Sequence, residues 1–199
     1  MKLIITLLLL GLNSLVYSQI ENPKFTEILK QFFITNNSGD IGRLIQDVGN
    51  IPGLSQSTKI ASTDTSLLYF NGFSSSFNPF SIPVNKIEIQ LRESRVLLKG
   101  EPFAKDTFFI VQIIGITDST EESRKKVQQE FRKLSKEFAA YFVAKGHRKS
   151  PKKQKRPSES VTFDLWPNKY KFLQLGWGGY YKNQNTHCIS LSVFFKSYY

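Results

Sequence analysis

The spacing of apolar residues changes twice between Thr65 and the end of the sequence, and this pattern constrains the fold more than any other feature. Between Thr65 and Ile116, apolar residues alternate with polar ones or run together, as in β-strands. Between Asp118 and Gly146 they recur every three or four residues, as on one side of an α-helix. The strand pattern returns between Val161 and Tyr199. One long helix between two groups of strands predicts an α+β domain with a largely antiparallel sheet, since the regular βαβ alternation of a parallel sheet is absent.

Most strands of this sheet can be placed from the sequence. We expect a central strand at Phe108 to Ile116, because it is apolar almost throughout and must be covered on both faces. The last two strands are expected to form a hairpin that turns around Asn183 to Asn185, with bulges or bends at Gly176, Gly178 and Gly179. The predicted strands cover residues 65–70, 87–91, 108–116, 161–165, 170–181 and 186–195, and the strand at 87–91 continues, or turns back, through Val96 to Leu98.

Three helices are predicted. The long amphipathic helix should begin at Asp118 or Ser119, run for about 25 residues, end at Gly146 and pack on the sheet. Two short N-terminal helices precede the strands: one starts at Asn22-Pro23, and the other follows Asp40.

The first 18 residues have the features of a secretion signal. Lys2 precedes an apolar run from Leu3 to Leu12, and a cut after Ser18 leaves small or apolar residues at the required positions. The run is shorter than the roughly 20 apolar residues of a membrane-spanning helix. We therefore expect residues 1–18 to be removed and residues 19–199 to form a single exported domain without a transmembrane helix. The alternative is an uncleaved membrane anchor.

Cys188 is the only cysteine, so no disulfide can form within the chain. Small secreted eukaryotic domains often carry disulfides, so their absence favours a bacterial source, with the protein in the periplasm or outside the cell.

Positive charge is concentrated in one segment. The formal net charge is +11, and seven of the 27 Lys and Arg residues lie between positions 145 and 156, without an acidic residue among them. Residues 147–160 contain no aliphatic or aromatic hydrocarbon side chain apart from prolines, which predicts a disordered basic loop. The candidate anion-binding residues are Lys145, Arg148, Lys149, Lys152, Lys153, Lys155 and Arg156.

An anionic lipid, polysaccharide or protein surface is the partner that such a loop would contact. Nucleic acid is disfavoured, because no aromatic side chain is interleaved with the cations from Arg148 to Ser160 to stack on bases. The alternative is a solvated loop that only keeps the protein soluble.

Three phenylalanines, Phe73, Phe77 and Phe80, lie in a serine-rich segment between two predicted strands. They could form the rim of a ligand site. The alternative is a loop that its phenylalanines hold against the core.

The sequence contains no motif typical of catalysis, metal binding or cofactor binding. His187 and Cys188 are adjacent in a predicted strand, so their side chains should point to opposite faces and cannot act together. The sequence therefore favours a non-enzymatic binding module without a metal or cofactor. The alternative is a small secreted hydrolase that uses two carboxylates from among Glu88, Glu93, Glu101, Asp106 and Asp164.

Overall fold

The computed structural model describes residues 41–51, 53–57, 61–63, 66–74, 76–97, 105–150, 157–164, 171–180 and 186–196. The expected signal segment at 1–18, the helix expected from Asn22 and the turn expected at 183–185 lie outside these residues. Among the helices of the described part, none is long and apolar enough to cross a membrane.

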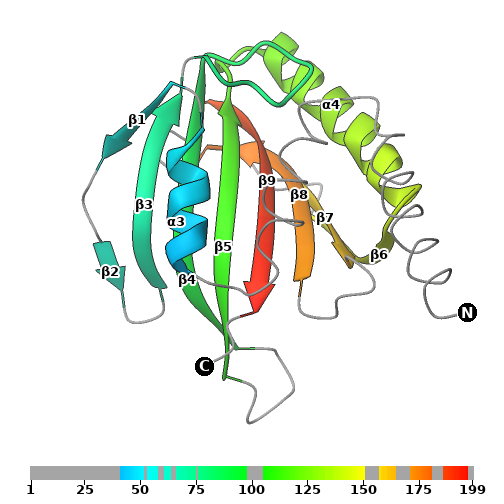
Figure 1. Ribbon diagram of the computed structural model, residues 1–199. Helices are drawn as coiled ribbons and strands as arrows, with labels where there is room; N and C mark the ends of the chain where they lie inside the picture. Colours follow the sequence, from blue (N-terminus) through cyan, green and yellow to red (C-terminus); the bar gives the residue numbers. More distant parts are fainter. Residues whose placement is uncertain are drawn as a thin grey trace, which may run out of the picture.

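The described residues form a single antiparallel sheet with two helices (Figure 1). The strand order is β1-β3-β4-β5-β9-β8-β7-β6, and β2 pairs with β3 beside this path. The α+β class and the antiparallel sheet expected from the sequence are therefore confirmed. The strands are β1 (Leu54–Ser57), β2 (Ala61–Thr63), β3 (Ser66–Ser74), β4 (Lys86–Leu97), β5 (Lys105–Ile116), β6 (Val143–Lys149), β7 (Glu159–Asp164), β8 (Lys171–Gly179) and β9 (His187–Lys196).

Helices α3 (Ile41–Gly49) and α4 (Glu121–Ala139) pack on the same face of the sheet, which we call the helix face (Figure 1). Leu44 and Val48 of α3 are fully buried in the same core as the apolar side of α4. Near the end of α4, the ring of Phe138 meets that of Phe163 from β7 edge-on, with centroids 5.8 Å apart. The opposite side of the sheet is called the far face.

The central strand is β5, as predicted. Its helix-face residues, among them Phe109 and Val111, belong to the main core, while Phe108 and Ile110 on the far face are also buried. Gly115 leaves space for a ring on the helix face, because a Cβ there would lie 2.8 Å from Phe80.

The long helix is shorter than predicted. It spans 19 residues and ends at Ala139, and the chain then turns and forms β6. Gly146 lies in β6 beside an irregularity in the register with β7, so the prediction that it ends the helix is wrong. Pairing with β7 gives most of the residues from 143 to 149 a ladder partner on one side, and these ladder hydrogen bonds replace the helical ones.

Two further expectations need correction. The disordered loop was predicted at residues 147–160, which is too long at both ends. His147, Arg148 and Lys149 belong to β6, and Glu159 and Ser160 begin β7. The glycines of β8 produce no bulge, since β8 stays in continuous register with β9 from Lys171 to Gly179 and with β7 up to Trp177. A bend at these glycines stays a prediction.

Candidate functional site

Three of the predicted anion-binding residues lie together on β6. Lys145, Arg148 and Lys149 belong to the edge strand of the sheet, in which all seven residues are exposed. The other four, Lys152, Lys153, Lys155 and Arg156, lie outside the described residues.

Carboxylates of β7 partly neutralise β6. The Lys145 Nζ lies 3.0 Å from an Asp164 oxygen and the Lys149 Nζ lies 3.9 Å from a Glu159 oxygen. Burial by itself raises the pKa of Glu159, but hydrogen bonds from His147 and Trp177 outweigh it and hold the pKa below its usual value. In the described part of the chain, Arg148 forms no ion pair.

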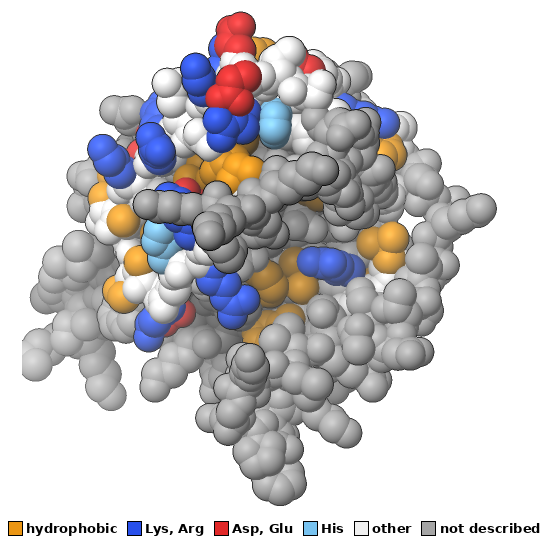
Figure 2. All heavy atoms as spheres, turned by 180° about the vertical axis from the view of Figure 1, so that it is seen from behind, with side chains coloured by type: hydrophobic (Ala, Val, Ile, Leu, Met, Phe, Trp, Pro, Cys, Tyr) orange, Lys and Arg blue, Asp and Glu red, His pale blue; other side chains and the backbone are white. Residues whose placement is uncertain are grey.

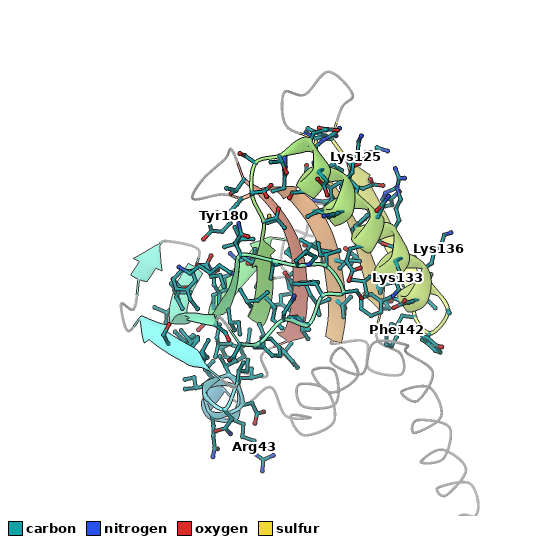
Figure 3. All side chains as sticks on the ribbon, turned by 90° about the horizontal axis from the view of Figure 1, so that it is seen from above. Arg43, Lys125, Lys133, Lys136, Phe142 and Tyr180 are labelled. Atoms are coloured by element: carbon teal, nitrogen blue, oxygen red, sulfur yellow. The ribbon has the colours of Figure 1, made fainter. Side chains whose placement is uncertain are left out.

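A second group of cations, which the sequence analysis missed, lies on α4. Lys125, Arg132 and Lys136 recur at intervals of seven and four residues, which places them on one side of the helix. All three are exposed, and none forms an ion pair with another described residue. Figure 3 shows Lys125 and Lys136 pointing away from the sheet.

The net charge of this part of the sequence does not reveal the stripe, because the acidic residues of α4 reduce that net charge. One of them, Glu130, is only 4% exposed and faces inward, where its carboxylate accepts a hydrogen bond from the Ser81 backbone N–H at 2.7 Å. Its charge therefore does not offset the outward cations at the surface. Seen from behind, Lys and Arg side chains gather over α4 and β6, on the left of Figure 2.

A pocket of about 490 Å³ lies next to β6 on the far face. It was not predicted. Four residues of the pocket lie directly opposite one another on neighbouring strands, as the strand register shows, and all four positions are on the far face. The residues of this row, in strand order from β6 to β9, are Arg148, Ser160, Gly176 and Ser190.

Gly176 forms a notch in the floor of this pocket. A Cβ at this position would lie 3.3 Å from the Ser190 Oγ and 3.5 Å from the Ser160 Cβ. Within the described structure, neither serine hydroxyl has a hydrogen-bond partner. Gln174 borders the same pocket, and its amide nitrogen donates to the Thr162 hydroxyl at 3.4 Å. The row thus contains an unpaired guanidinium and two hydroxyls without a partner, and the residue between the two serines has no side chain.

The three phenylalanines considered as a ligand rim are not gathered in one place. Phe80 is 4% exposed in the core of the helix face, and Phe77 is half-buried against the same core. Phe73 lies on β3, where the Lys86 Nζ sits 3.4 Å from the centre of its ring.

The carboxylates considered for a catalytic pair are separated wherever the structure describes their side chains. Glu88 is completely buried and accepts hydrogen bonds from Tyr180 and Gln90, while Glu93, five residues further along β4, lies on the other face and accepts from Tyr69. Asp164 is four strands from Glu88, on the order of 19 Å along the sheet. Catalytic pairs in glycosidases are separated by about 5 to 9.5 Å. Glu101 lies outside the described residues, and only the backbone of Asp106 is described.

His187 and Cys188 lie on opposite faces, as predicted. His187 is close to the beginning of α4, where burial and the neighbouring Arg124 lower its pKa. Cys188 pairs with Gly178 on the pocket side, and burial raises the pKa of its thiol to about 11. A thiol with this pKa is protonated at neutral pH and is a poor nucleophile. In the described part of the chain, no cluster of three or more His, Cys, Asp or Glu side chains could hold a metal ion.

No known protein family, curated protein or solved structure matches this chain.

Proposed function

We propose that the protein is an exported, non-enzymatic binding module that attaches to an anionic component of the cell envelope. The attachment surface is the basic face, defined as Lys125, Arg132 and Lys136 of α4 with Lys145 and Lys149 of β6. The observation that carries the proposal is the stripe of exposed, unpaired cations along α4, next to an edge strand that is exposed throughout. Lys152, Lys153, Lys155 and Arg156 follow β6 in the sequence and extend the charge.

The charges on this face are available to a partner. Exposed ion pairs such as Lys145 with Asp164 contribute only about 0 to 1 kcal/mol, so an external anion can replace the carboxylate. Each Lys or Arg near an anionic surface contributes about 1 kcal/mol. Five cations therefore give strong attraction at low salt, and the attraction weakens as the ionic strength rises.

Neutralising two unpaired cations of α4 tests the proposal. The variant Arg132→Gln/Lys136→Gln should weaken binding to vesicles containing phosphatidylglycerol, or to polygalacturonate, by about 30-fold at low salt, since two cations contribute about 2 kcal/mol. Co-sedimentation measures vesicle binding, and calorimetry measures binding to the polymer.

The matched control removes the same charge elsewhere. Arg43 projects from α3, far from α4 (Figure 3), and Lys86 lies on β4, so Arg43→Gln/Lys86→Gln should leave binding nearly unchanged. Equal loss in both variants would show that only net charge matters and would refute the basic face. Failure of the unmodified protein to bind either anion at low salt would refute the proposal as a whole.

A further inference from the structure

We propose that the far-face pocket binds one acidic sugar unit, a hydroxylated ring that carries a carboxylate or a phosphate. This inference rests on the proposed function and makes it more specific, because it identifies the anionic component as an acidic polysaccharide. The basic face would supply long-range attraction, and the pocket would supply the chemical selectivity.

The size of the pocket suits such a unit. Its volume of about 490 Å³ is within the range of roughly 300 to 1,000 Å³ that is typical of small-molecule sites. The notch at Gly176 is bordered by side chains of β7 and β9. A side chain at this position would occupy the space between the two serines.

The charge in the pocket favours an oxyanion. Arg148 lies on the far face at the β6 side of the row and has no carboxylate partner among the described residues. A guanidinium presents two parallel N–H donors that match a carboxylate or a phosphate. Lys149 and Glu159 also border the pocket, but they form a pair with each other and so contribute little net charge.

The remaining polar groups favour a hydroxylated carrier over a bare ion. A serine hydroxyl both donates and accepts, so Ser160 and Ser190 can bind sugar hydroxyls in either sense. The ring of Trp177 offers no stacking surface, since the residue is 7% exposed and its indole N–H points to Glu159. Recognition therefore depends on hydrogen bonds and on Arg148.

Two single variants test the pocket without changing the net charge. Arg148→Lys keeps the charge but loses the planar pair of donors, and should weaken binding of glucuronate or glucose 6-phosphate by about tenfold or more. Gly176→Ala places a methyl group in the notch and should weaken binding by a similar factor. Gly146→Ala is the matched control, because a Cβ there has nothing within 4 Å.

NMR titration of backbone amides provides the readout. Glucuronate or glucose 6-phosphate should shift the amides of Gly176, Gly178 and Ser190, whereas glucose and inorganic phosphate at the same concentration should shift them much less. An unchanged amide spectrum elsewhere shows that each variant is folded.

The two proposals fail in different ways. A monosaccharide in the pocket is too small to reach α4, so Arg132→Gln/Lys136→Gln should leave glucuronate binding intact even though polymer binding falls. Absence of shifts with both sugar acids, equal shifts with inorganic phosphate, or unchanged affinity in Arg148→Lys would overturn the pocket assignment. In each of these cases, vesicle and polymer binding through the basic face would stand.

Discussion

The environment of Cys188 shows how one position in the sheet sets the chemistry of a side chain. The thiol faces the far side of β9 beside Gly178, and burial raises its pKa from 9.0 to about 11. The folded protein therefore binds the thiol proton more tightly than the unfolded chain does. It follows that stability is lost as the pH rises from about 9 to 11, because the unfolded state ionises first.

Removing the thiol should eliminate this part of the pH dependence. The stability of the native protein relative to Cys188→Ala should fall by about 2 to 3 kcal/mol between pH 8.5 and pH 11, since one pKa unit corresponds to about 1.36 kcal/mol. Urea unfolding at several pH values measures the free energy of unfolding of both proteins. The difference between the two values isolates the thiol, because the other titrating groups are the same in both proteins. A constant difference across this range would contradict the assigned environment.

Helix α4 illustrates how local signals and packing act together in one element. Its N-cap is Thr120, whose hydroxyl accepts from the Ser123 N–H at 3.2 Å, rather than Asp118 or Ser119 as the sequence suggested. Asp118 instead accepts hydrogen bonds from the backbone N–H and the hydroxyl of Thr120. A side-chain hydrogen bond from Ser123, together with these two from Thr120, lowers the pKa of Asp118 to about 2. The apolar stripe was predicted correctly, and it holds α4 against the sheet.

Packing of α4 depends strongly on Phe138. The residue is fully buried between Phe142 and Phe163, so Phe138→Ala should lower the free energy of unfolding by about 3 to 5 kcal/mol, because it removes a large ring and leaves a cavity. Phe138→Leu fills more of the space and should cost less. Urea unfolding followed by tryptophan fluorescence and by circular dichroism measures both variants. A loss below about 1 kcal/mol in Phe138→Ala would show that α4 packs elsewhere.

At the scale of the whole molecule, apolar and charged residues are separated. One continuous core joins α3, α4 and the helix face of the sheet, and the cations lie outside it on α4 and β6. The far face carries amide and hydroxyl side chains at matching positions of five neighbouring strands: Gln90, Gln112, Ser192, Gln174 and Thr162. The pocket lies at the β7–β9 end of this polar row.

Export of the whole molecule is the remaining part of the proposal. The basic segment in residues 145–156 would have no access to an envelope polymer if the chain stayed in the cytosol. We expect the native protein, isolated from its source, to begin at Gln19 after removal of residues 1–18. N-terminal sequencing of the exported fraction checks this, and a chain that begins at Met1 in the cytosolic fraction would contradict it.

Much of the fold followed from the sequence because periodicity is a local property. Burial of one face requires alternation in a strand and a repeat of three or four residues in a helix, so β5 and the apolar stripe of α4 could be placed before the structure was known. Strand β6 could not, since all its residues are exposed and no apolar alternation marks it.

The sequence by itself determined the α+β class, the central strand and the concentration of positive charge in residues 145–156. Only the tertiary structure decided which residues meet at the candidate site. Arg148, Ser160, Gly176 and Ser190 come from four strands, and the register of those strands brings them into one row. Register depends on long-range pairing, and burial of Glu130 depends on packing, so neither can be read from neighbouring residues along the chain.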